Sequence, residues 1–329
     1  MGIDNVFTEK INLKYTQLIH KSNVEHHRGD NKKALEYTYL AYMSSKKDHK
    51  IKIETKVQIS ILYCIRMQDY DLRSYWKNIK KILIDILEVT SKNELFFYKA
   101  KILYILADYT YLKRDFEEYH KYYGQLIDIL NVKFSKFFVK SSISELFSMV
   151  YLSRAMYLLS NDSSLSLSYI KKGLIEYKYN KNNFLRMRLY IQLGRYYWYK
   201  KDEKCLLIFK SILQKTKKKD FIKQKYHQWD DLILEVLFTM SSSQVFFKYY
   251  NEALESCREA LRVSRAITSI EMEAETLVLM CKILLKKDDI QENSEIFNDA
   301  YNFCNKNNYQ DLLEDLKTIQ KEMRNKNAK

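Results

Sequence analysis

Three histidines near the start of the chain are the first candidates for chemistry. His20, His26 and His27 are close in sequence, and His20 and His27 would share one face of a helix. A zinc site needs further ligands at suitable spacing, and none is apparent, so we expect solvated or groove-lining histidines and no metal or cofactor. The chain also lacks GxxxxGK[ST], GxGxxG, HExxH and GxSxG, and its five glycines cannot build a phosphate-binding loop. The sequence therefore favours a protein that is not an enzyme.

A second chemistry is nucleic-acid binding, for which residues 213–229 (LQKTKKKDFIKQKYHQW) are the candidate. Lysines with interleaved aromatic residues suit nonspecific contact with phosphates. The net charge of +15 is uneven: residues 151–250 carry 19 Lys and Arg against 8 Asp and Glu, whereas residues 251–300 carry 6 against 11. A basic surface beside an acidic one would suit a charged partner, and two solvated faces explain the same pattern. Both interpretations stay open.

The cysteines indicate the compartment. There are five, at positions 64, 205, 257, 281 and 304, with no CxxC pair and an odd total. This pattern predicts free, buried thiols in a reducing compartment. No secretory signal is apparent, and no apolar stretch approaches the roughly 18 residues that span a membrane. We therefore expect a soluble, cytoplasmic protein without a membrane partner.

The elements that position these side chains are predicted to be helices. The chain of 329 residues has no proline and five glycines, so both main helix breakers are nearly absent. One glycine, Gly194, lies inside the helical pattern of residues 190–213 (YIQLGRYYWYKKDEKCLLIFKSIL), where it costs about 1 kcal/mol relative to alanine. A closely crossing helix explains such a glycine, so we expect Gly194 to face a partner helix.

Residues 190–213 also recur along the chain. The segment 106–129 (LADYTYLKRDFEEYHKYYGQLIDI) repeats their pattern of a small residue, tyrosines, a turn with aspartate and a second helix. Equivalent positions fall at 34, 75, 119, 166, 206, 253 and 293, and the copies around 75 and 166 are the weakest. Each unit is predicted to be a pair of antiparallel helices, and stacked pairs share a continuous core.

Leu193-Gly194-x-Tyr196-Tyr197, followed by a turn with Asp202, resembles the tetratricopeptide repeat (TPR) pattern over about residues 10–305. The resemblance implies an all-α, right-handed solenoid of about seven TPR-like helix pairs with a C-terminal capping helix. We expect a lead-in at 1–11, the repeat array at 12–305, and the capping helix with a polar tail at 306–329. The repeat of about 43 residues is similar to that of the cytosolic peptide-pheromone receptors of Gram-positive bacteria and their phages. That group comprises the Rap phosphatases and quorum-sensing regulators.

The resemblance implies that the first helix of each pair lines a concave ligand-binding groove. Arg188 and Arg195 form its cationic centre, because arginine recognises carboxylates in a planar, bidentate way and a helix-lined groove suits an extended peptide. The alternative is that both arginines pair with carboxylates of the scaffold, for example Glu235. Glu275 lies on the same strip. The groove-facing positions are Asn23, Tyr104, Asp108, Tyr111, Tyr151, Arg188, Gln192, Arg195, Trp198, Glu235, Phe238, Ser242 and Lys282.

The function predicted from these residues is regulatory. We expect a cytosolic protein that takes a short signalling peptide, or a segment of a partner protein, in its groove and relays it to a response regulator or transcription factor. The family's transcription regulators begin with a helix-turn-helix, which is not recognisable here. One alternative is a nucleic-acid-binding regulator that uses residues 151–250. The other is a Rap-like response-regulator phosphatase, for which Gln58 and Gln68 are the available glutamines.

Overall fold

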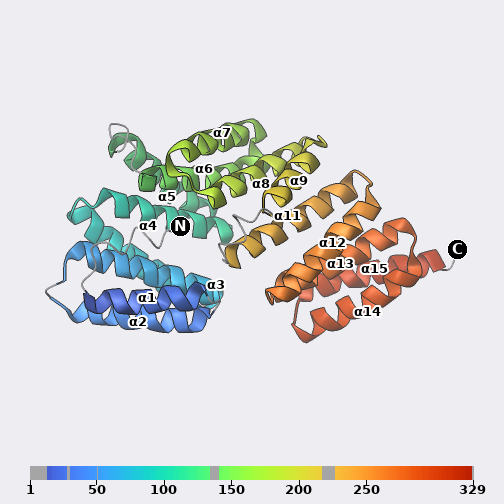
Figure 1. The fold of residues 1–329 in the computed structure, drawn as a ribbon, viewed down its shortest axis with the longest axis horizontal. Coiled ribbons are helices and arrows are strands. Elements are labelled where there is room, and N and C mark those ends of the chain that lie inside the picture. Colours follow the sequence, from blue (N-terminus) through green and yellow to red (C-terminus); the bar gives the residue numbers. More distant parts are fainter. Residues whose placement is uncertain (1–12, 28–29, 50, 134–140, 217–226, 328–329) are drawn as a thin grey trace. The chain divides into compact units, whose positions relative to one another are not determined.

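The computed structural model describes residues 13–27, 30–49, 51–133, 141–216 and 227–327 (Figure 1). This part of the chain consists of helices joined by short turns and contains no strand, which confirms the all-α class. In chain order the helices are α1 (Leu13–His27), α2 (Asn31–Lys47), α3 (Ile53–Lys92), α4 (Phe96–Leu112), α5 (Phe116–Lys133), α6 (Ser141–Asn161), α7 (Ser163–Asn180), α8 (Asn183–Tyr199), α9 (Lys204–Thr216), α11 (His227–Phe246), α12 (Tyr250–Ala266), α13 (Ile270–Lys287), α14 (Ile290–Lys306) and α15 (Gln310–Asn327).

Most consecutive helices pack as the antiparallel pairs that the repeat predicted. Within the described ranges the pairs are α1/α2, α4/α5, α6/α7, α8/α9, α11/α12 and α13/α14, with α15 packed on both α13 and α14. We call the first helix of each pair its A helix and the second its B helix.

Eight turns in the described part of the chain stop a helix with a left-handed residue other than glycine. Asp202 N–H donates to the Tyr197 carbonyl (2.9 Å) and Lys201 N–H to the Trp198 carbonyl (2.8 Å), a pattern that satisfies the last carbonyls of α8 when Lys201 takes a left-handed backbone (φ 57°). A non-glycine residue in this conformation is strained by about 1–2 kcal/mol. The exposed residues with positive φ in the described part are Glu94, Arg114, Lys181, Lys201, Lys248, Thr268, Asp288 and Asn308.

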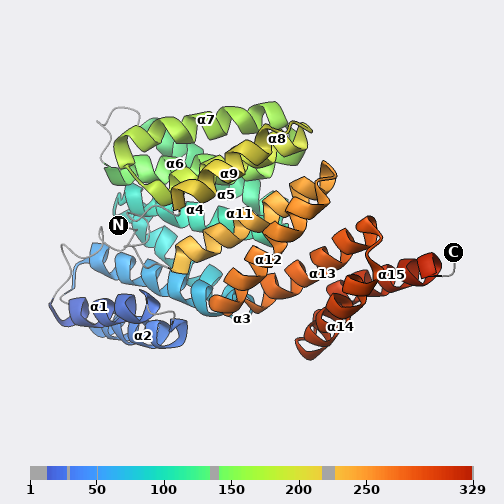
Figure 2. The ribbon, with the colours of Figure 1, turned by 45° about the vertical axis from the view of Figure 1, so that its right-hand side comes forward.

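The second predicted pair, centred on position 75, is wrong. The chain from Ile53 to Lys92 forms one helix of 40 residues, α3. Its middle, MQDYDLRSYW, contains no glycine or proline, and the backbone stays helical throughout. The long helix still serves two repeats, because its first half packs beside α2 and its second half reaches α5 (Figures 1 and 2).

Contacts divide the chain into two compact units, and each is described here by itself. Unit 1 comprises residues 1–157 and 171–186, and unit 2 comprises residues 158–170 and 187–329. The predicted division into lead-in, array and cap is a different partition and stays a prediction.

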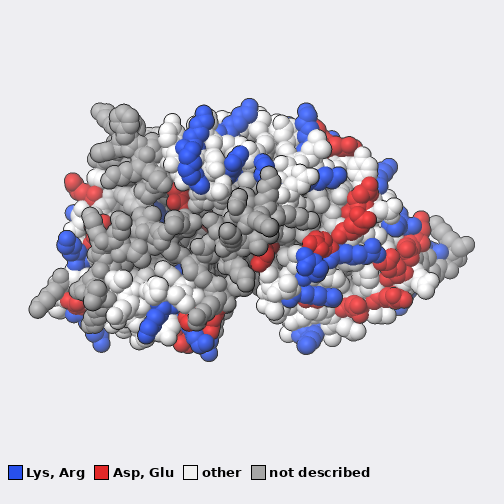
Figure 3. Space-filling view, in the orientation of Figure 1, with Lys and Arg blue, Asp and Glu red and all other residues white. Residues whose placement is uncertain are grey.

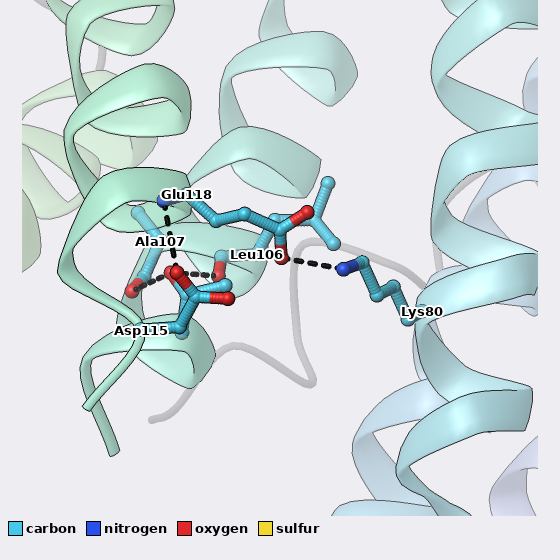
Figure 4. Close-up of polar contacts among 6 residues, drawn as sticks. Lys80, Leu106, Ala107, Asp115 and Glu118 are labelled. Carbon is cyan, nitrogen blue, oxygen red and sulfur yellow. Dashed lines mark hydrogen bonds and ion pairs between the residues drawn. The ribbon is translucent and has the colours of Figure 1, made fainter. Parts of the chain in front are cut away.

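The core of unit 1 is rich in aromatic side chains. Trp76 of α3 stacks on the buried Tyr109 of α4, with ring centroids 3.5 Å apart. On the outer side Lys80 of α3 forms an ion pair with Glu118 of α5, and Asp115 accepts a hydrogen bond from the Glu118 N–H (3.1 Å) at the start of α5 (Figure 4). Helix α3 is thus joined to α4 by an aromatic stack and to α5 by an ion pair.

The predicted role of Gly194 is confirmed in unit 2. A Cβ atom at this position of α8 would lie 2.6 Å from Cζ of Phe209 on α9, and that ring is completely buried. The glycine therefore lets α8 and α9 approach closely. In the next pair Ala253, Cys257 and Ala260 of α12 are completely buried at the corresponding spacing.

Candidate functional site

The thirteen predicted groove residues fall on the A helices of the two units. We define the unit 1 strip as Asn23 (α1), Tyr104, Asp108 and Tyr111 (α4) and Tyr151 (α6). The unit 2 strip is Arg188, Gln192, Arg195 and Trp198 (α8), Glu235, Phe238 and Ser242 (α11), and Lys282 (α13), to which we add Glu275 (α13) as a fourteenth residue. Of the thirteen, Gln192 is buried and the others are half-buried. They are neither core nor fully solvated, but their grouping into one ligand-binding groove stays a prediction.

In the unit 1 strip, Asn23 is bound to the scaffold. Its side-chain oxygen accepts a hydrogen bond of 2.9 Å from Nη2 of Arg66 on α3, and Arg66 is 2% exposed. Asn23 therefore joins α1 to α3. A ligand would have to displace or share this contact.

The aromatic residues of unit 1 form a packed cluster. Tyr111 lies 5.8 Å from Tyr119 and 6.1 Å from Tyr157, measured between ring centroids. The guanidinium carbon of Arg154 lies 4.9 Å from the ring centre of Tyr123 and 5.0 Å from that of Tyr157, which is cation–π geometry. Desolvation raises the pKa of Tyr119 to about 12. Tyr111 thus belongs to a packed aromatic cluster around an arginine.

The two arginines of the predicted cationic centre on α8 differ in their contacts. Arg195 forms an ion pair with Glu235 of α11, with 3.0 Å between Nη2 and Oε1, and Nη2 also lies 3.4 Å from Oγ1 of Thr239. Both charged side chains are about one quarter exposed. Arg195 therefore has the scaffold partner that the alternative named, and its contact with a ligand stays a prediction.

Arg188 lies two turns before Arg195 on α8, and it differs. Its Nε is buried without a hydrogen-bond partner, and so is Nε2 of Gln192, one turn further along the same helix. Among the described residues no ion pair involves Arg188. A buried donor left unpaired costs about 1–3 kcal/mol, and the described scaffold supplies no acceptor for either of these two atoms.

The rest of the unit 2 strip is partly occupied by scaffold contacts. The hydroxyl of Ser242 donates to the Phe238 carbonyl of its own helix (3.1 Å), and Lys282 lies 2.6 Å from Asp315 of α15. Burial, and secondarily Glu271, raises the pKa of Glu275 above its usual range. No contact in the described residues neutralises this carboxyl group.

Sequence reasoning missed a register that connects these residues. Arg195, Ser242 and Lys282 each stand six positions before the left-handed residue that ends their A helix, which are Lys201, Lys248 and Asp288. Arg188, Glu235 and Glu275 each stand thirteen positions before the same residues. Aligning the repeats on their turns, rather than on their small residues, would have revealed this register.

The other sequence candidates have structural explanations or lie outside the described residues. Gln58 is 6% exposed and donates to the Tyr98 hydroxyl, so it belongs to the scaffold. In the described part no group of three His, Cys, Asp or Glu side chains could hold a metal. Of the basic stretch 213–229, residues 217–226 lie outside the described part, and nucleic-acid binding stays untested.

The prediction that all five cysteines are free and buried is confirmed, and the reducing compartment stays a prediction. Burial raises the pKa of Cys205 and Cys257 to about 11 and that of Cys281 to about 12, so these thiols stay protonated at neutral pH. They are structural side chains and not nucleophiles.

Among the described residues of the acidic segment 251–300, three ion pairs join a basic side chain to an acidic one of the same segment. Figure 3 shows basic and acidic side chains side by side on the visible face of this part of the chain. Arg258 lies 2.6 Å from Glu292, and Arg262 lies 2.7 Å from Glu259. The solvated-face interpretation and the acidic docking surface both stay open for this segment.

Comparison with known proteins shows the fold but no closer kinship. No protein-family model matches the chain, and no curated protein does either. The apo form of the quorum sensor NprR from B. thuringiensis is similar, with a TM-score of 0.64, 13% identity, and coverage of 92% of this chain and 80% of that one. NprR in complex with its cognate peptide NprX has a TM-score of 0.58 at 13% identity, with coverage of 91% and 81%.

Aspartyl phosphate phosphatase F from Bacillus subtilis also has a TM-score of 0.58 at 13% identity, and the match covers 95% of this chain and 80% of that one. The chain therefore has the TPR-like helical fold of the peptide-pheromone receptor group, as the sequence resemblance implied. Every helix in the described ranges is too short or too polar to cross a membrane.

Proposed function

We propose that the chain is a regulator that binds a short signalling peptide, or a segment of a partner protein, along the unit 2 strip. Binding is relayed to a response regulator or transcription factor, and the protein acts in the cytosol, as its free cysteines predicted. The observation that carries this proposal is the pair of buried, unpaired donors, Arg188 Nε and Gln192 Nε2, on the predicted ligand-facing side of α8. Peptide carbonyl and carboxylate oxygens are the acceptors that such donors require.

The fold supports the same proposal. NprR, whose fold this chain shares, has been observed in complex with its cognate peptide. A peptide on the A helices would contact several repeats at once, and the half-buried Trp198 and Phe238 would supply apolar contact area.

The test uses pools of random hexapeptides with free termini, retained on the immobilised full chain and identified by mass spectrometry. We expect wild type to retain a defined subset, and Arg188→Ala/Gln192→Ala to bind the members of that subset at least tenfold more weakly. Arg262→Ala is the matched control, because Arg262 is exposed on α12 and pairs with Glu259. Failure of wild type to retain any peptide, or equal binding by the double variant, would contradict the proposal.

A further inference from the structure

The A helices of unit 2 are joined by a ladder of ion pairs with one repeated register. Arg195 of α8, six positions before its turn, bonds Glu235 of α11, which is thirteen positions before the next turn. The same register continues at the C-terminal end, where Lys282 of α13 bonds Asp315 of α15. Asp315 stands 40 residues after Glu275, the same separation as between Glu235 and Glu275. Each ion pair joins a cation of one repeat to a carboxylate of the next repeat.

The step between α11 and α13 breaks this register. The cation position there is Ser242, whose hydroxyl bonds a carbonyl of its own helix. The carboxylate position is Glu275, for which the described residues provide no hydrogen bond or ion pair. The two junctions on either side are bridged, so the vacancy lies between α11 and α13.

A second vacancy of opposite sign lies on α8. Arg188 stands thirteen positions before its turn, where the two following repeats have Glu235 and Glu275. Its Nε has no hydrogen-bond partner. Gln192, which is 2% exposed, leaves Nε2 unpaired one turn away. The Arg195–Glu235 pair stands between the two vacancies. The strip thus presents unpaired donors at α8 and an unpaired acceptor at α13.

We infer that the ligand completes this ladder. It carries a lysine or arginine side chain that binds Glu275 between α11 and α13, and a carboxylate or backbone carbonyl that binds Arg188 and Gln192. The inference rests on the proposed function and narrows it to a basic peptide bound in one direction.

The missing ion pair between α11 and α13 can be tested without a ligand, by placing a cation on α11 itself. Ser242→Arg places a cation at the register of Arg195 and Lys282, and Ser242→Gln is the matched uncharged control. We expect the melting temperature of Ser242→Arg at pH 7 to exceed that of Ser242→Gln by about 2 °C. The gain should disappear when both substitutions are made in a Glu275→Gln background. Equal melting temperatures, or a gain that survives Glu275→Gln, would overturn the inference.

The ligand chemistry is tested with paired hexapeptide pools that contain one arginine or one citrulline at each position. We expect wild type to bind the arginine pool about tenfold more tightly, and Glu275→Gln and Ser242→Arg to lose that preference. Equal retention of both pools would overturn the inference while leaving the proposed function intact. Retention of neither pool would count against the proposed function itself.

Discussion

The strips of the two units differ in how far the scaffold uses its own polar groups. In unit 1, Asn23 bonds the buried Arg66, and Arg154 lies over the rings of Tyr123 and Tyr157. In unit 2, Arg188 and Gln192 keep buried donors without partners. A polar side chain on an A helix can therefore bond the scaffold or keep a donor without a partner. Available polar groups, and not the mere presence of charge, mark the better candidate for a binding surface.

Two glycine substitutions, one in each unit, compare how closely the helices pack. Gly194→Ala is expected to lower the free energy of unfolding by about 2–3 kcal/mol, because the added methyl group overlaps the buried ring of Phe209. Gly124→Ala in α5 of unit 1 is the control, since a Cβ there has no neighbour within 4 Å and the helix gains about 1 kcal/mol. Urea unfolding measures both. A gain in both variants would show that α8 and α9 do not cross closely at Gly194.

Two arginines provide the next comparison. Arg154→Ala should lower the free energy of unfolding by about 1–2 kcal/mol, because it removes cation–π contacts with two tyrosines. Arg188→Ala should change it by less than about 0.5 kcal/mol, because no partner in the described residues is lost and a buried, unpaired Nε is removed. Thermal unfolding of the two variants decides. Equal losses would mean that Arg188 is as much a scaffold residue as Arg154.

The unpaired carboxyl group of Glu275 should appear in the pH dependence of stability. Its pKa in the folded state is raised above the ordinary value of 4.5, so the folded state binds the proton more tightly than the unfolded state does. Stability therefore falls as the pH rises above about 4.5 and through the folded pKa.

Glu275→Gln removes this loss. We expect the free energy of unfolding of the variant at pH 7 to exceed that of wild type by less than about 1 kcal/mol. The two free energies should become equal near pH 4. Unfolding curves between pH 4 and 7 measure the difference. A variant that is less stable at pH 7 would mean that the Glu275 carboxylate has a cationic partner.

The sequence was sufficient for the helical hairpins, because the scarcity of helix breakers and the recurring small residues both reflect packing. Gly194 could be placed at a helix crossing for that reason. The continuous helix α3 could not be predicted, since the other turns end on residues such as Lys201 and Arg114 that are ordinary helix formers. These left-handed residues carry no distinctive type, and only the aspartates that follow them, such as Asp115 and Asp202, are a recognisable turn signal.

The candidate site was predictable in part. Spacing placed Arg188, Gln192 and Arg195 on one face of a helix, and complementary charge suggested the pair with Glu235. Which arginine stays unpaired depends on the distance and rotation between neighbouring helices. A single sequence does not encode that geometry in any one residue, so Arg188 and Arg195 look equivalent until the helices are placed.

The most direct test of the account is the affinity of retained arginine-containing hexapeptides for two variants that differ only in which unit is altered. Arg188→Ala/Glu275→Gln removes both vacancies of unit 2, and Asn23→Ala alters the unit 1 strip. We predict a loss of at least tenfold for the unit 2 variant and less than a twofold change for Asn23→Ala. Undiminished binding by Arg188→Ala/Glu275→Gln, together with a loss in Asn23→Ala, would contradict the account.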